Sequence, residues 1–174
     1  MKKYNWVIIG TGVIGNEMAS ALKQENGEIY GVYNHHVEKG QAFAREYGVR
    51  KVFESEEALL ADPEVDVVYI GTPHNYHYET LMRAVGAGKH VFCEKAITVN
   101  ARQLEEVAAL GLERGVVVME GMTIYHMPLY QKLREMVDSG AIGRVKMIQV
   151  NFGSCKEYDV KNRFFDKALA GGAL

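Results

Sequence analysis

Residues 6–15 read WVIIGTGVIG, and this stretch decides the fold. Four consecutive apolar residues that end in a glycine are typical of a β-strand buried on both faces. The glycines that follow fit the pattern G-x-G-x-x-G, which joins the first strand of a dinucleotide-binding domain to its first helix. The pattern is weak by itself, and its place between a buried strand and a helical repeat makes it informative.

Each glycine of this turn has a steric reason. Gly10 permits the tight turn, Gly12 lets the backbone approach a pyrophosphate, and Gly15 lets the helix pack close to the strand. The helix N-terminus adds unpaired N–H groups and a partial positive charge for the anion. The alternative is a strand-to-helix turn that binds no ligand. The predicted coenzyme contacts in the turn are Gly10, Thr11, Gly12, Val13, Ile14 and Gly15.

Strand-like and helix-like patterns alternate over the first 121 residues. Short apolar runs predict further strands over residues 29–33, 65–70, 90–93 and 116–119. Helical spacing predicts a helix after the glycine-rich turn and others over residues 78–85 and 100–115, the last opened by Asn100 and Gln103, which resemble a capping box. This alternation predicts an α/β fold: a doubly wound parallel sheet with helices on both faces, as in the Rossmann domain.

The pattern changes after Gly121. Pro128 can start a helix that ends at Ser139-Gly140, and residues 144–152 have the pattern of a strand with mixed faces. Residues 163–174 are expected to form a loop around Gly171-Gly172. This change indicates a second domain that begins at residue 122.

The composition excludes several classes of protein. Twenty basic against 22 acidic residues give a net charge of -2, so no basic field exists for nucleic acid or an anionic membrane. Cys93 and Cys155 show no metal-ligand spacing, which favours reduced thiols, no metal site and a cytoplasmic location. Ala19-Ser20-Ala21 resembles a signal-peptidase site, but Gly10, Gly12 and Gly15 interrupt the apolar region that a signal peptide needs.

The end of the second predicted strand bears on the choice of coenzyme. NAD-specific sites usually place Asp or Glu there, about 20 residues after the glycines, to bind the adenosine ribose. This chain has Tyr33-Asn34-His35-His36 instead, and its next carboxylate is Glu38. Asn34 and His35 could donate hydrogen bonds to a 2′-phosphate, whereas the alternative for the histidines is a solvated loop. We therefore predict NADP as the coenzyme, with NAD as the alternative.

Residues 72–77 follow the predicted strand over 65–70, and residues 94–96 follow the one over 90–93. Both segments lie at the carboxyl ends of the strands, where open α/β sheets bind ligands. Lys95 is the candidate general acid or base, because burial and neighbouring charge can bring a lysine pKa toward neutrality. Glu94 would hold its ammonium group, and the alternative is a surface ion pair between adjacent residues. His74 and His77 fit a loop and a helix start better than catalysis. The predicted coenzyme contacts at these ends are Thr72, Pro73, His74, His77, Glu94 and Lys95.

Several motifs in a fixed order resemble the Gfo/Idh/MocA oxidoreductase family, which includes glucose–fructose oxidoreductase and inositol dehydrogenase. They cover essentially the whole chain: residues 10–15, Thr72-Pro73 with His77, Gly88-Lys89-His90-Val91 before Cys93-Glu94-Lys95, and residues 138–143. Residues 119–122, 163–164 and 169–174 are most similar to the dihydrodiol and D-xylose dehydrogenase branch.

The resemblance implies hydride transfer between NAD(P) and a hydroxyl or carbonyl carbon of a sugar, polyol or cyclic diol. Lys95 matches the family's lysine, which contacts the substrate oxygen and the nicotinamide ribose. Residues 1–121 would then be the NAD(P)-binding Rossmann domain. Residues 122–174 would begin an incomplete α+β domain that binds substrate and forms a homo-oligomer at full length.

The chain departs from the family in two places. Ala96 stands where the family usually has proline, and a cis bond before a residue other than proline costs about 3–4 kcal/mol, so we predict a trans Lys95–Ala96 bond. Family members are also roughly twice as long, so we expect a fragment that is inactive alone. The rival hypotheses are a non-enzymatic NAD(P)-binding sensor or regulator, and a surface interaction module that would need an exposed apolar patch.

Overall fold

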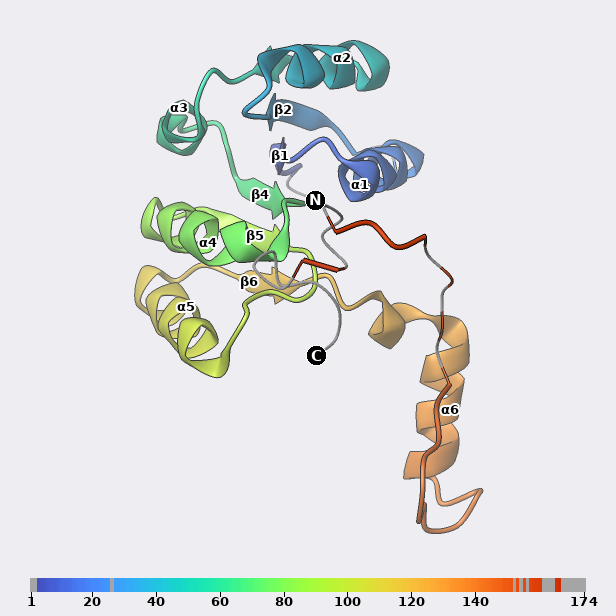
Figure 1. The fold of residues 1–174 in the computed structure, drawn as a ribbon. Helices are drawn as coiled ribbons and strands as arrows, with labels where there is room; N and C mark the ends of the chain where they lie inside the picture. Colours follow the sequence, from blue (N-terminus) through green and yellow to red (C-terminus); the bar gives the residue numbers. More distant parts are fainter. Residues whose placement is uncertain are drawn as a thin grey trace. The chain divides into compact units, whose positions relative to one another are not determined.

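The computed structural model describes residues 3–25, 27–151, 153, 155, 157–160 and 165–166. Contacts divide the chain into unit 1, Met1–Gly121, and unit 2, Met122–Leu174. The alternating strands and helices lie in unit 1, and one α-helix dominates the described part of unit 2 (Figure 1).

Unit 1 alternates strands and helices along the sequence. Its strands are β1 (Trp6–Ile9), β2 (Ile29–Tyr33), β3 (Lys51–Val52), β4 (Val67–Ile70), β5 (His90–Cys93) and β6 (Val118–Glu120). Its helices are α1 (Val13–Gln24), α2 (Val37–Tyr47), α3 (Glu56–Ala61), the short 3-10 helix η1 (His74–Tyr76), α4 (His77–Gly86) and α5 (Ala101–Arg114).

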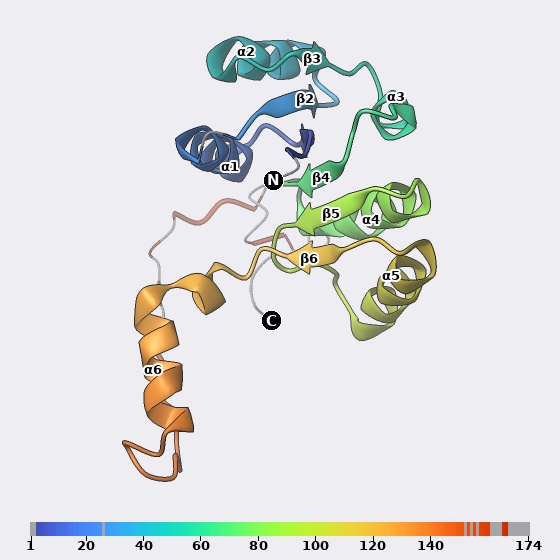
Figure 2. The same cartoon turned by 180° about the vertical axis from the view of Figure 1, so that it is seen from behind.

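The strands form one parallel sheet in the order β3-β2-β1-β4-β5-β6. The chain runs outward from β1 to β3 and then crosses to β4 on the other side of β1, so the switch point lies between β1 and β4. Helices α1 and α2 lie on one side of the sheet, and α3, α4 and α5 lie on the other (Figures 1 and 2). This arrangement confirms the predicted doubly wound Rossmann fold.

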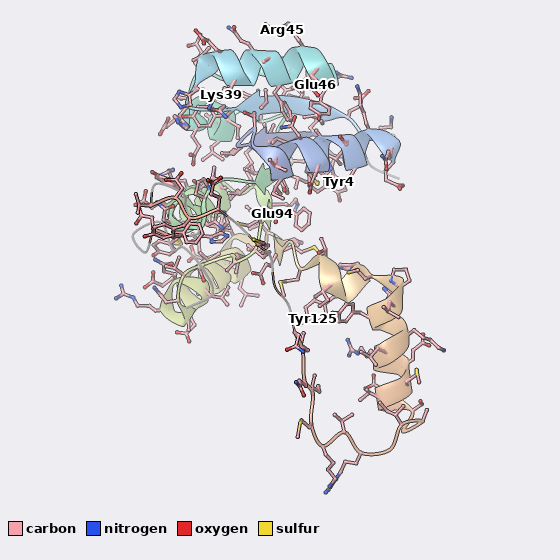
Figure 3. The ribbon with its side chains drawn as sticks, turned by 45° about the vertical axis from the view of Figure 1, so that its right-hand side comes forward. Tyr4, Lys39, Arg45, Glu46, Glu94 and Tyr125 are labelled. Carbon is pink, nitrogen blue, oxygen red and sulfur yellow. The ribbon has the colours of Figure 1, made fainter. Side chains whose placement is uncertain are left out.

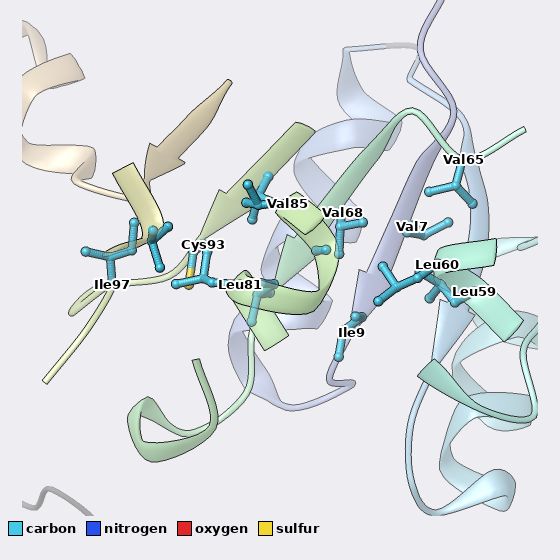
Figure 4. Packing of buried hydrophobic residues seen from close by; sticks show 14 of the residues in the cluster. Val7, Ile9, Leu59, Leu60, Val65, Val68, Leu81, Val85, Cys93 and Ile97 are labelled. Atoms are coloured by element: carbon cyan, nitrogen blue, oxygen red, sulfur yellow. The ribbon is translucent and has the colours of Figure 1, made fainter. Parts of the chain in front are cut away.

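The two faces of the sheet bury separate apolar clusters, because successive strand residues point to opposite faces. The larger cluster packs strand side chains such as Val7 and Val68 against Leu59 of α3 and Leu81 of α4 (Figure 4). The smaller one packs Ile8, Val32 and Tyr69 against α1 and α2. The central strands β1 and β4 are therefore buried on both faces, as the continuous apolar run at β1 predicted.

The sequence patterns did not predict α2, β3 or α3. Local signals for the two helices are nevertheless present. Helix α2 ends at Gly48, which has the left-handed conformation with φ 70°, and α3 begins after Ser55, whose hydroxyl accepts a hydrogen bond from Ala58 N. Strand β3 has two residues at the edge of the sheet, which is too short for an apolar pattern.

The start of α5 follows the predicted capping pattern in part. Asn100 Oδ1 accepts a hydrogen bond from Gln103 N at 3.0 Å, as the capping box requires. Gln103 Oε1 accepts from Val99 N rather than from Asn100 N. The helix then ends at Gly115, again in the left-handed conformation.

Unit 2 contains η2 (Thr123–His126) and α6 (Pro128–Asp138), and α6 starts at the predicted proline. The predicted strand over residues 144–152 is wrong for residues 144–151, which are exposed and form no strand. A strand needs a neighbouring strand for its backbone hydrogen bonds, and a periodic pattern cannot supply one. Phe152, residues 163–164 and the predicted loop around Gly171-Gly172 lie outside the described residues.

Two further features of the described residues concern the cysteines and the length of the helices. Cys93 and Cys155 are both free thiols, one buried and one exposed. Across the described residues, no helix combines the length and the apolar character that crossing a membrane requires.

Candidate functional site

The turn between β1 and α1 is built on two glycines that the fold itself requires. Gly10 has φ +96°, and a Cβ on it would lie 2.8 Å from the carbonyl oxygen of Gly71. A Cβ on Gly15 would lie 2.2 Å from the carbonyl oxygen of Gly10. Any larger residue at either position would force the turn away from β4 or the helix away from the turn.

Gly12 is different, because nothing lies within 4 Å of the position that its Cβ would occupy. Its φ of -76° is open to any residue, and it caps α1 without a side-chain hydrogen bond. The fold therefore leaves open space in front of the helix N-terminus, where backbone N–H groups favour an anion. This space fits the diphosphate of a dinucleotide.

Asn34, at the end of β2, is tied to the same turn. Its Nδ2 donates to Thr11 Oγ1 at 2.6 Å, and its Oδ1 accepts from His36 N at 2.8 Å. Since Thr11 Oγ1 accepts this bond, the hydroxyl hydrogen of Thr11 is left to donate elsewhere. The rings of His35 and His36 lie 4.0 Å apart and are exposed.

The turn has a further support that the sequence did not indicate. Asn16, one turn into α1, donates through Nδ2 to the carbonyl oxygens of Thr11 at 3.2 Å and Gly12 at 2.8 Å. An asparagine inside a helix carries no sequence signal for this bond, because its partners are set by the path of the turn.

His77 connects the segments that follow β4 and β5. Its ring is 0% exposed, with Nε2 2.8 Å from the carbonyl oxygen of Thr72 and Nδ1 2.9 Å from that of Ala96. Both ring nitrogens thus lie against backbone carbonyl oxygens, and the coenzyme contact of His77 stays a prediction. His77 acts as a brace behind the site.

Thr72 supplies an unsatisfied polar group at the end of β4. Its Oγ1 is the one buried side-chain oxygen or nitrogen, among the described residues, that has no hydrogen-bond partner. Such an atom is costly to leave unpaired. A coenzyme group arriving at this strand end would give it a partner, so Thr72 also fits a ligand site.

Glu94 and Lys95 do not form the expected pair. Glu94 Oε1 accepts a hydrogen bond from Tyr69 OH at 2.8 Å, and no ion pair to Lys95 occurs within the described residues. The Lys95 side chain is exposed. Burial, followed by the hydrogen bond to Glu94, raises the pKa of Tyr69 far above its usual value, so the phenol stays a donor. Figure 3 labels Glu94 at the ends of the strands.

The Lys95–Ala96 peptide bond is cis, so the prediction of a trans bond is wrong. That prediction considered only the identity of residue 96, whereas the structure fixes the backbone on both sides of it. Glu94 N donates to Ile70 O at 2.9 Å, and Ile97 N donates to Glu120 Oε1 at 2.9 Å. These partners come from β4 and β6, and no local pattern indicates them.

The comparisons with known proteins agree with this geometry. The family described as "Oxidoreductase family, NAD-binding Rossmann fold" matches residues 4–122, and the C-terminal domain of the same family matches residues 130–174. The chain belongs to the Gfo/Idh/MocA oxidoreductase family. It is therefore related to enzymes that use a nicotinamide coenzyme, as the motifs indicated.

Curated relatives match nearly the whole chain in sequence. Trans-1,2-dihydrobenzene-1,2-diol dehydrogenase from Xenopus tropicalis is 33% identical over 172 residues, which cover 97% of this chain and 52% of the relative. The human enzyme of the same name is 31% identical, with 97% and 51% covered. The chain thus spans about half the length of the curated relatives it matches.

Two solved structures have a similar fold. A 3-ketoreductase from Actinomadura kijaniata, in complex with NADP and TDP-benzene, has a TM-score of 0.75 and 30% identity over 80% of this chain and 43% of its own. An NAD-binding oxidoreductase from Klebsiella pneumoniae has a TM-score of 0.76 and 29% identity over 82% and 40%.

Proposed function

We propose that residues 1–121 bind NADP(H), and that the whole protein transfers a hydride between NADP(H) and a hydroxyl or carbonyl carbon of a sugar, polyol or cyclic diol. The contrast among the three glycines carries the proposal. Packing explains Gly10 and Gly15, whereas Gly12 faces open space at the start of α1, where the approach of a pyrophosphate favours a residue without a side chain. The relatives named as diol dehydrogenases and a ketoreductase support the class of substrate.

The preference for NADP rests on the end of β2. The Thr11 hydroxyl and the Asn34 amide lie together there, with exposed His35 beside them and no carboxylate before Glu38. Hydrogen-bond donors attract a 2′-phosphate, whereas the carboxylate of an NAD-specific site would repel it. NAD is the alternative coenzyme.

Lys95 would carry the proton transfer. When bound, the coenzyme supplies or accepts the hydride. In its neutral form Lys95 Nζ would accept the substrate hydroxyl proton during oxidation, and as an ammonium it would donate a proton to the carbonyl oxygen during reduction. Its exposed ammonium, without an ion pair to a described residue, is available to a substrate. Thr72, Pro73 and His74 would line the coenzyme side of the same edge.

The second domain, the partners and the location are part of the proposal. Residues 122–174 would begin the α+β domain that completes the substrate site and forms a homo-oligomer, and the match of the C-terminal family domain supports this role. The free thiols favour the cytoplasm. The net charge of -2 argues against nucleic acid and membrane partners.

The test is a set of sugar, polyol and diol substrates offered to the whole protein, with the change in NADPH absorbance as the signal. Lys95→Ala should lower turnover roughly 10²-fold or more, the range of a lost general acid or base, and leave the Kd for NADPH within about twofold. Equal turnover in the variant would remove the lysine from the reaction. Tight coenzyme binding without turnover of any substrate would favour the sensor.

A further inference from the structure

A carboxylate is held at the strand ends of the second half of the sheet. Glu94 directly follows β5, its backbone N donates to Ile70 O at the end of β4, and its Oε1 accepts from Tyr69 OH. Tyr69 is 1% exposed, so its phenol has a fixed position. The half-buried Glu94 carboxylate is therefore oriented by a hydrogen bond from the neutral Tyr69 phenol.

The neighbouring strand leaves room for this carboxylate. Gly121 follows β6, and a Cβ on it would lie 3.1 Å from Glu94 Oε1 and 3.4 Å from the carbonyl oxygen of Cys93. Gly121 N donates to that same carbonyl oxygen at 2.7 Å. The glycine therefore lets β6 close on β5 without displacing the Glu94 side chain.

The surroundings of Glu94 are negative. Burial raises the pKa of the Cys93 thiol, and the carboxylates of Glu94 and Glu120 raise it further, which places both charges near the end of β5. Within the described residues no cation pairs with Glu94, and the charge of the exposed Lys95 is screened by water. The protein thus keeps a carboxylate at this edge without neutralising it.

The position of this charge matters because the two halves of a Rossmann sheet bind the two nucleotides of the coenzyme. The glycine-rich turn and β2 belong to the adenosine half, so the ends of β4, β5 and β6 belong to the nicotinamide half. The oxidised nicotinamide ring carries one positive charge. The reduced ring, after gain of a hydride, is neutral, while the rest of the dinucleotide is unchanged.

We propose that Glu94, oriented by Tyr69, sets the relative affinity of the chain for the two redox states of the coenzyme, favouring the oxidised form. This inference rests on the proposed function. A fixed carboxylate attracts the cationic ring and has no net charge to attract in the reduced ring. The ratio of the affinities for NADP⁺ and NADPH therefore reports the contribution of Glu94. Contacts with the phosphates and the adenosine are the same for both forms, so they do not change this ratio. Tyr69 is a positioning residue, because it acts through Glu94.

The test compares dissociation constants for NADP⁺ and NADPH, measured by calorimetry on the chain itself. In Glu94→Gln, which keeps the shape and removes the charge, the ratio of the NADP⁺ to the NADPH constant should rise about fivefold, the effect of one partly exposed charge pair. Glu105→Gln is the matched control, since Glu105 is an exposed carboxylate on α5, and its ratio should equal that of the wild type.

A second variant isolates the phenol. Tyr69→Phe keeps the ring in the core and the charge on Glu94, and should move the ratio in the same direction by a smaller factor. An unchanged ratio in Glu94→Gln, with both forms still bound, overturns the proposal. A shift in Glu94→Gln alone overturns only the role of Tyr69. If the wild type binds neither form, it is the proposed coenzyme function that fails.

Discussion

His77 Nε2 lies 2.8 Å from the carbonyl oxygen of Thr72, and this bond fixes the segment after β4 against the first turn of α4. The other ring nitrogen lies 2.9 Å from the carbonyl oxygen of Ala96, after β5. One buried ring thus sets the spacing of the two segments that carry Thr72 and Lys95. Contacts within the protein thus hold the two segments in place, and such contacts lower the cost of ordering a site on binding.

Removing this ring should destabilise the chain measurably. His77→Leu removes the ring that lies against the carbonyl oxygens of Thr72 and Ala96. Because a neutral imidazole donates to only one of them, the free energy of unfolding should fall by about 1–3 kcal/mol. Urea denaturation measures the change. The control His35→Asn alters an exposed histidine and should change stability by less than about 0.5 kcal/mol. A His77→Leu chain as stable as the wild type would mean that the His77 ring does not hold the two segments together.

Two glycine substitutions should separate folding from binding. Gly15→Ala places a methyl group 2.2 Å from Gly10 O and should lower stability by about 1–3 kcal/mol. Gly12→Ala meets no protein atom, so its stability should be close to that of the wild type, while its Kd for NADPH should rise roughly tenfold or more. Calorimetry and thermal unfolding measure both. Undiminished binding by Gly12→Ala would mean that no diphosphate approaches this residue.

A carboxylate at the end of β2 should change the preference for the coenzyme. Asn34→Asp places a negative charge beside Thr11 and should weaken NADPH binding about tenfold through repulsion of the 2′-phosphate, while NADH binding stays within about twofold. Asn34→Ser, which adds no charge, is the control and should have a smaller effect. If NADPH and NADH lose affinity equally in Asn34→Asp, the 2′-phosphate does not lie at this strand end.

Asp62 should make stability depend on acid pH. The hydrogen bond from Lys51 at 2.7 Å is the main cause that lowers the pKa of Asp62 below 3.8, and the bonds from Glu64 N and Tyr30 OH lower it further. A carboxyl whose pKa is lower in the folded state stabilises the fold above its unfolded pKa. That contribution is lost as the pH falls from about 4 through the lower, folded value.

Asp62→Asn removes this contribution. Thermal unfolding should show a melting temperature roughly 2–5 °C below that of the wild type at pH 7, with a difference that shrinks below pH 4. Glu113→Gln, an exposed carboxylate on α5, should show no such convergence. A difference that stays constant from pH 7 to pH 3 would mean that the Asp62 bonds are not linked to its charge.

The sheet was predictable because the sequence patterns that specify its strands and turns each lie within a few consecutive residues. The apolar runs at β1 and β4, the glycines at 10–15 and the caps of α5 each occupy a few consecutive residues. The segment between β2 and β4 was missed although Gly48 and Ser55 mark its helix ends. Helix α3 has six residues and β3 has two, and α2 buries only Gly40 and Phe43. An apolar pattern alone does not specify such small elements.

For the site, the sequence predicted which positions belong to it but not which groups those residues contact. Strand ends indicated Thr72, Glu94 and Lys95, but their partners come from other elements. Tyr69 has the pattern of an ordinary buried strand residue, and only the sheet register places its phenol against Glu94. The burial of His77 and the cis bond before Ala96 depend in the same way on contacts distant in sequence.

The most direct test of coenzyme binding is a calorimetric titration of this chain with NADPH and, separately, with NADH. The account predicts saturable binding of NADPH to one site per chain, weaker binding of NADH, and loss of NADPH affinity in Gly12→Ala. A well-folded chain that shows no saturable binding of either coenzyme would contradict the account.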